Sequence, residues 1–138
     1  MKTLVSILAI FLSLSSGFAQ ESTVNITVTI ENVVSDNGKV LAGLHTADTF
    51  MKGLGIQNLE SEIKDGKVTL TFENVPSGTY AIMAMHDAND NKRMDYQDNG
   101  MPKESYGMSG NDMSFGPPNF EMAKFEVGSE NLTFNIRF

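Results

Sequence analysis

Residues 87–98 carry oxygen-bearing side chains at close intervals, in the stretch Asp-Ala-Asn-Asp-Asn-Lys-Arg-Met-Asp-Tyr-Gln-Asp. Counted from the first residue, carboxylate or amide oxygens fall at positions 1, 3, 5, 9 and 12, and position 7 offers a backbone carbonyl. These positions are Asp87, Asn89, Asn91, Asp95 and Asp98, with Arg93 at position 7. A calcium ion binds six to eight oxygens at about 2.3–2.6 Å. The spacing therefore predicts a structural Ca²⁺ site.

The stretch departs from the EF-hand calcium loop in three ways. Lys92 stands at the sixth position, where that loop has glycine, and Asp98 replaces the longer closing glutamate. The residues before Asp87 are typical of a strand, whereas an EF-hand requires a helix. Because Asp and Asn are also ordinary turn residues, the alternative is an ion-free loop closed by side-chain hydrogen bonds.

Histidine and methionine form a second set of candidate metal ligands. His45 and His86 each end a predicted strand, and they could share a transition metal if those strands were neighbours. Seven methionines cluster within forty residues around His86: Met83, Met85, Met94, Met101, Met108, Met113 and Met122. Thioether and imidazole ligands suit Cu(I), so a periplasmic copper carrier is the alternative function. Methionines are also common core fillers, and Met83 and Met85 share the strand face opposite His86.

The sequence does not decide between several roles for three further residues: Glu104, Tyr106 and Glu121. They could complete a cation site, bind a ligand or satisfy the backbone of a buried loop. Neither histidine stands with a Ser or Cys nucleophile in a recognisable motif. We therefore expect no enzyme activity.

Strands are expected wherever apolar and polar residues alternate. This pattern predicts strands at residues 22–30, 39–45, 67–73, 79–86, 120–127 and 131–138. The first two are expected to form a hairpin, and the third is expected to follow a tight turn at residues 63–67. The fourth is apolar on both faces, which predicts a central strand. The candidate ion loop is thus anchored at the end of a buried strand.

Two stretches lack a strand pattern. Residues 47–61 indicate a short helical turn followed by coil, since Gly53 and Gly55 discourage a long helix. Residues 87–118 indicate one long loop, which is uncommon in a compact domain unless it has a function. About six or seven strands with almost no helix favour an antiparallel β-sandwich of transthyretin-like or immunoglobulin-like type.

The N-terminus has the features of a secretory signal peptide. Lys2 is followed by an apolar run at residues 4–14 and by small residues at 17 and 19, which predicts cleavage before Gln20. The run is too short to span a membrane. Residues 20–138 are therefore expected to form a single domain that is periplasmic, cell-surface or extracellular. We expect a monomer without membrane insertion.

The amino-acid composition limits the classes of partner that the chain is expected to bind. The 138-residue chain has a net charge of −7 and no cysteine, so it folds without disulfides and cannot carry a lipid on cysteine. An acidic chain argues against nucleic acid as a partner, because phosphates bind cationic surfaces.

Several motifs after residue 74 resemble those of a known family. The strand entry at residues 75–81, Val-Pro-Ser-Gly-Thr-Tyr-Ala, is similar to a turn of transthyretin-like and collagen-adhesin B-type sandwich domains. The other motifs are His86-Asp87, Asn89, Asn91, Lys92 and Asp95; Pro102-Lys103-Glu104, Tyr106-Gly107 and Ser109; and Phe115 to Glu121 with Ala123 and Phe125. Together they resemble the bacterial exported domain of unknown function 2141. The resemblance implies an exported β-sandwich and no particular reaction.

The loop at residues 87–98 is also similar to the calcium loop of the B repeats in Gram-positive surface adhesins, which follows directly on a strand. This resemblance implies Ca²⁺ ligands at the oxygen-bearing positions, with Lys92 in place of a glycine. We therefore expect a binding or structural module whose partner is a cell-surface protein or a glycan.

Overall fold

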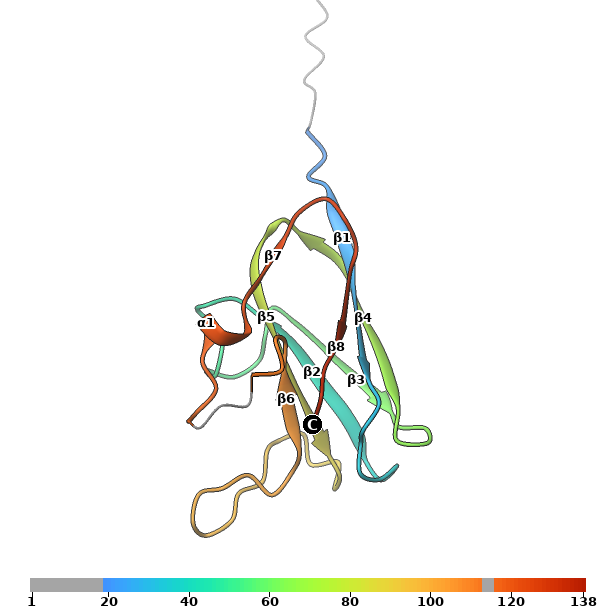
Figure 1. The fold of residues 1–138 in the computed structure, drawn as a ribbon, viewed down its shortest axis with the longest axis vertical. Helices are drawn as coiled ribbons and strands as arrows, with labels where there is room; N and C mark the ends of the chain where they lie inside the picture. The colour runs from blue at the N-terminus through green and yellow to red at the C-terminus, as the bar shows by residue number, and fades with distance from the viewer. Residues whose placement is uncertain (1–18, 113–115) are drawn as a thin grey trace, which may run out of the picture.

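The computed structural model describes residues 19–112 and 116–138 (Figure 1). The predicted signal peptide, apart from Ala19, and Met113 lie outside these ranges. Nine elements follow along this part of the chain: β1 (Thr23–Ile30), β2 (Lys39–His45), β3 (Gln57–Glu62), β4 (Val68–Pro76), β5 (Gly78–Asp87), β6 (Tyr106–Met108), α1 (Phe120–Ala123), β7 (Phe125–Val127) and β8 (Leu132–Asn135). Within the same ranges, no helix has the length and apolar character that a membrane span requires.

The strands form two sheets that face each other. One sheet has the order β4-β1-β8, and the other has the order β3-β2-β5-β6, with β7 also paired to β5. The β-sandwich predicted from the sequence is confirmed. Since β5 pairs with β2, β6 and β7, its predicted central position is confirmed as well.

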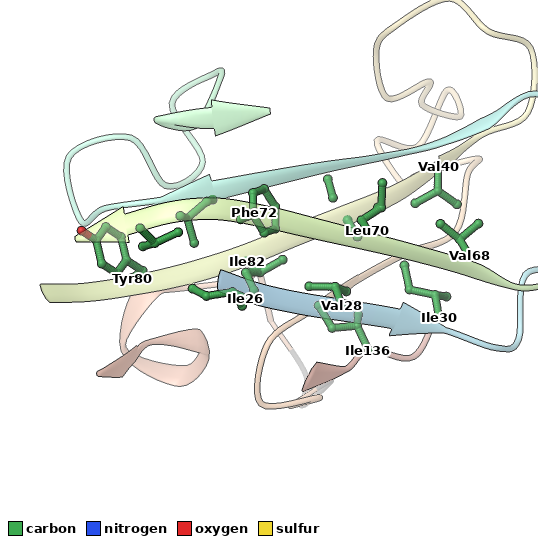
Figure 2. Packing of buried hydrophobic residues seen from close by; sticks show 14 of the residues in the cluster. Ile26, Val28, Ile30, Val40, Val68, Leu70, Phe72, Tyr80, Ile82 and Ile136 are labelled. Atoms are coloured by element: carbon green, nitrogen blue, oxygen red, sulfur yellow. The ribbon is translucent and has the colours of Figure 1, made fainter. Parts of the chain in front are cut away.

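The main core lies between the two sheets, where alternate residues of each strand point inward (Figure 2). In β1, the buried residues Ile26 and Val28 stand opposite Phe72 and Leu70 of β4. The second sheet contributes inward-facing apolar residues, among them Ile82, from the other side of the core. In β1 and β4, this alternation buries one face of the strand and leaves the other face more open to solvent.

The predicted hairpin between the first two strands is wrong. β1 lies beside β4 and β8, whereas β2 lies beside β3 and β5 in the other sheet. The alternating pattern requires only that both apolar faces reach one core. A pair that packs across a sandwich meets that requirement as well as a pair joined by hydrogen bonds.

The sandwich is also not antiparallel throughout, because β1 and β8 pair in parallel through the register Val28↔Phe134. Parallel pairing requires a long connection between the two strands. Here most of the chain lies between the two strands, so no local sequence pattern indicates that they pair.

Two strands were not predicted. Residues 47–61, expected to be a helical turn and coil, contain β3 from residue 57 onward. β3 is mostly polar because it pairs only with β2, at the edge of its sheet, and Leu59 alone among its residues packs against the core. β6 is a three-residue strand inside the expected loop at residues 87–118.

The strand expected at residues 120–127 begins instead as the one-turn helix α1. The Asn119 side chain accepts a hydrogen bond from the Met122 N–H at 3.0 Å and so caps the N-terminus of the helix. The strand β7 starts only at Phe125. The final strand, expected at residues 131–138, is shortened to residues 132–135.

The tight turn before β4 is confirmed, although the strands that it joins lie in different sheets. Lys64 and Lys67 exchange backbone hydrogen bonds of 3.1 and 3.0 Å around it. Asp65 and Gly66 have φ angles of 53° and 71°. This left-handed pair is the type I′ geometry that an Asp-Gly sequence favours.

Candidate calcium loop and metal ligands

Asp87, the last residue of β5, is fully buried and organises the beginning of the loop. Its Oδ1 accepts the Asn91 N–H at 3.1 Å, and its Oδ2 accepts the Lys92 N–H at 2.8 Å. The carboxylate therefore holds the chain in a turn that brings residues 89–92 back over the end of the strand.

Asn89, Asn91 and Asp95 meet at one point of this turn. The Asn89 Nδ2 donates to Asp95 Oδ2 at 2.7 Å, and the Asn91 Nδ2 lies 3.1 and 2.9 Å from the two oxygens of the same carboxylate. The Asn91 Oδ1 in turn accepts the Arg93 N–H at 3.1 Å. The structure thus brings together four of the predicted ligand residues, since Asn91 is also bonded through its backbone to Asp87.

Asp98 stands apart from these four, whereas Arg93 adjoins them through its backbone. Asp98 lies on an exposed turn at residues 97–100, where it lines an open depression with Gln97, Asn99 and Lys103. The Arg93 side chain is exposed, and its Nε lies 4.0 Å from Asp95 Oδ1. Asp98 therefore lies away from the residues at the beginning of the predicted ligand set.

Glu104 fastens the far side of the loop. Its two carboxylate oxygens accept the N–H groups of Ala88 and Asp95, each at 3.2 Å. The Lys103 N–H also donates to the Asp95 carbonyl at 2.8 Å. Of the roles left open for Glu104 by the sequence, the structure shows the satisfaction of loop backbone.

Lys92 stands at the sixth position of the loop, which is glycine in an EF-hand, and it has a φ of 64°. Its Nζ lies 2.5 Å from Glu60 Oε2 and 3.1 Å from Asp90 Oδ1, so the side chain attaches the loop to β3. Lys39 of β2 bonds the other Glu60 oxygen at 2.9 Å. Hydrogen bonds from these two ammonium groups lower the pKa of the Glu60 carboxyl to about 2. The Glu60 and Lys92 side chains are exposed and the Lys39 side chain is partly exposed, so solvent screens these ion pairs.

The donor set fits a hard cation. Two carboxylates and two amides provide oxygen atoms, which Ca²⁺ prefers. Nowhere in residues 19–112 and 116–138 do three or more His, Asp or Glu side chains gather in a group that could hold a metal. A calcium site here would therefore rely on amide and backbone oxygens as well as on Asp87 and Asp95.

The two histidines cannot share an ion. Their strands β2 and β5 are neighbours, but the register places Val40 opposite His86 and His45 opposite Ala81, five residues farther along β2. His86 points to the inner face, where its Nε2 lies 2.7 Å from the Asn37 carbonyl oxygen. His45 points to the outer face. His45 is five residues from Val40, the partner of His86, and residues an odd number apart on a strand point to opposite faces. This arrangement excludes the shared His45–His86 site that the sequence left open.

A second apolar cluster covers the outer face of β5. It consists of Phe50, Ala81, Met108 and Ala123, with Met83 and Phe120 packed against it. The buried Ser109 hydroxyl joins this layer to the sheet, since it donates to the Ala123 carbonyl and accepts the Ile82 N–H at 2.9 Å. Nothing in the sequence indicated this layer, because its members come from four separate stretches.

The two remaining uncertain residues lie away from the loop at residues 87–98. Tyr106 lies on β6 opposite Met85 and lines a small cavity beside Pro117 and Pro118. Glu121 is an exposed residue of α1 and pairs with Lys124 at 2.5 Å. Neither residue therefore contributes an oxygen to the candidate ion site.

Comparison with known proteins gives one match. The sequence profile of a family described as "Uncharacterized protein conserved in bacteria (DUF2141)" matches residues 28–135. No curated protein and no solved structure shows a significant match. The matched region contains nearly all of the sandwich and the whole candidate calcium loop. This chain belongs to the DUF2141 family of proteins conserved in bacteria.

Proposed function

We propose that this protein is an exported binding module whose loop at residues 87–98 is ordered by Ca²⁺. The observation that carries the proposal is the hydrogen-bonded turn at the buried end of β5, in which the Asp87 carboxylate accepts the Asn91 N–H and the Asn91 side chain donates to the Asp95 carboxylate. Because Asp87 lies on a strand, the loop is anchored at one end, which lowers the conformational freedom that it loses when it closes around an ion.

An ion could replace the hydrogen bonds that the Asp95 carboxylate now accepts. Asn89 and Asn91 both present Nδ2 to Asp95. Rotation of an amide by 180° exchanges its NH₂ group for its carbonyl oxygen, which is a cation ligand. Ca²⁺ would then neutralise the Asp95 carboxylate in place of the two amide donors. Arg93 would contribute its backbone carbonyl, and Asp98 would have to approach from its exposed turn.

The function of the ion would be to hold a surface in place. Residues 96–102 form a projecting hairpin, in which Tyr96 bridges Pro102 and the Gln97 N–H donates to the Met101 carbonyl at 2.8 Å. The side chains of Tyr96 and Met101 are 58% and 60% exposed. Asp95 and Glu104 flank this hairpin and are joined by a hydrogen bond, so its position depends on the same residues that organise the loop. A cell-surface protein or a glycan is the proposed partner.

Thermal unfolding after chelation, with and without added Ca²⁺, tests the proposal. Extracellular calcium modules have dissociation constants of about 10⁻⁴–10⁻³ M, so millimolar ion is required. An ion at 100 times its dissociation constant stabilises the folded state by about 2.7 kcal/mol, which raises Tm by several degrees. Equal stabilisation by Mg²⁺ and Ca²⁺, or by neither ion, would contradict a calcium site.

Asp95→Asn is the informative variant, because Asp95 is a proposed ligand that no buried backbone group depends on. We expect it to remove the stabilisation by Ca²⁺ while the chelated protein keeps nearly its original Tm. The matched control is Asp48→Asn, which makes the same change at an exposed residue outside the loop. Retention of the full calcium effect in Asp95→Asn would show that the ion binds elsewhere.

A further inference from the structure

A row of residues crosses the outer face of the larger sheet and contains a gap. Strand pairing places Asn58 opposite Gly43, Gly43 opposite Met83, and Met83 opposite Met108. Directly opposed residues on one face have Cβ atoms about 4.5–5.5 Å apart. Because Gly43 has no side chain, the row has an empty position directly beside Met83.

The His45 imidazole occupies this position. A Cβ atom added to Gly43 would lie 2.7 Å from His45 Nε2 and 3.3 Å from Asn58 Oδ1. The ring therefore leans back over Gly43, toward the row that holds the two methionines. His45 is 5% exposed, and Met108 is 3% exposed. A buried nitrogen base and two thioethers thus share one small region of the outer face.

The hydrogen bonds of His45 leave one ring nitrogen available. Nδ1 lies 3.2 Å from Thr49 Oγ1, and the Thr49 hydroxyl donates to the Thr46 carbonyl. Since that hydroxyl hydrogen is already used, the ring must donate from Nδ1, and Nε2 then carries the free lone pair. Within residues 19–112 and 116–138, no hydrogen bond occupies Nε2. Burial also lowers the pKa of His45, which favours the neutral ring that binds metals.

We propose that His45 Nε2 and the thioether sulfurs of Met83 and Met108 form a binding site for a monovalent soft metal ion, Cu(I). Thioethers select Cu(I), and imidazole is a ligand that copper accepts. Each methionine side chain has three rotatable bonds, so its sulfur can adjust to the ion. The site uses neither His86 nor the loop at residues 87–98, and it stands independently of the calcium proposal.

The layer above the row suits a low-coordinate ion. Phe50 packs edge-on against His45, with ring centroids 5.9 Å apart, and Phe120 packs against Phe50 at the same separation. These rings, with Ala123, cover part of the outer face and limit the access of water to it. Met83 is only partly buried, so it offers a path by which an ion can enter from solvent.

The test is a competition for Cu(I) between the purified protein and a chromogenic Cu(I) chelator, under anaerobic reducing conditions. We expect Met83→Leu and Met108→Leu each to weaken Cu(I) affinity at least tenfold, and the double variant to abolish measurable binding. Leucine has nearly the volume of methionine, so these variants should keep the fold. Met101→Leu is the matched control, because it makes the same change at an exposed loop residue.

NMR spectroscopy with Ag(I) tests directly which residues bind the metal ion. Ag(I), a redox-inert substitute for Cu(I), should shift the NMR methyl signals of Met83 and Met108 and the ring signals of His45, while leaving those of Met101 in place. Thermal unfolding of each variant establishes that it is folded. Failure of the wild-type protein to compete for Cu(I) would overturn the proposal. So would Met83→Leu and Met108→Leu variants that bind Cu(I) as tightly as wild type.

Discussion

The two regions that β5 supports differ in how they are held together. At its C-terminal end, the loop at residues 87–98 is fixed by carboxylates and amides that bond to backbone groups beside open solvent. On its outer face, the cluster around Phe50 and Met108 is fixed by apolar packing. Carboxylate and amide oxygens thus lie at the end of this strand, whereas methionine side chains lie on its covered outer face. Hydrated cations can reach the first region, whereas the second suits an ion that loses its water easily.

The contrast also concerns the residues on which each region depends. The polar loop relies on a single buried carboxylate, whose loss would leave two backbone donors without a partner. The apolar cluster spreads its packing over several residues, so a substitution that preserves volume changes little. Changes at Asp87 should therefore affect stability far more than changes at the outer-face methionines.

Asp87→Ala should have the largest effect. It leaves the Asn91 and Lys92 N–H groups without their acceptor, and each unsatisfied buried donor costs about 1–3 kcal/mol. We expect the free energy of unfolding to fall by about 2–4 kcal/mol in denaturant titrations with chelator present. Asp98→Ala, the control in the same loop, should stay within about 0.5 kcal/mol of wild type. A similar loss in both variants would mean that Asp87 does not organise the loop.

Replacement of Lys92 should have an intermediate effect. Its φ of 64° favours glycine, and a side chain in this conformation costs about 1–2 kcal/mol. Lys92→Gly relieves that cost but loses exposed ion pairs worth about 0–1 kcal/mol, whereas Lys92→Ala loses the ion pairs alone. Chemical denaturation should therefore show the glycine variant to be more stable than the alanine variant by about 1 kcal/mol. Equal stability would argue that the loop adopts another backbone conformation in solution.

A smaller effect should appear in the pH dependence of stability. Burial lowers the pKa of His45 below its ordinary value of 6.5, so the unfolded chain binds a proton more readily than the folded chain. Stability is therefore complete above pH 6.5 and decreases as the pH falls from 6.5 toward the lower folded-state pKa. His45→Gln should flatten this slope in urea titrations at several pH values. An unchanged slope would assign the effect to other groups.

The proximity of residues within the loop followed from the sequence more directly than the pairing of the strands did. The intervals between Asp87, Asn89, Asn91 and Asp95 led to one candidate site, and the structure brings these four residues together. Local spacing was sufficient because the whole group lies within nine residues of the chain. Asp98 was harder to place, because a separate turn at residues 97–100 carries it away from the others.

Strand pairing could not be predicted in the same way. Alternation identified β1, β2, β4 and β5, yet it did not show that β1 and β2 belong to opposite sheets. It also missed the polar edge strand β3, since an edge strand buries little and has no strong pattern. The parallel partner of β1 is more than a hundred residues away along the chain.

By itself, the sequence determined the sandwich class, the buried central strand and the loop that follows it, because each depends on neighbours along the chain. Only the tertiary structure decided which residues lie beside each histidine, because neighbours across a sheet come from distant parts of the chain. His45 and His86 lie on adjacent strands but on opposite faces, and Met83 meets Met108 through pairing across a long loop. A soft-metal site of this kind depends on register, and register is set by packing between distant segments rather than by local spacing.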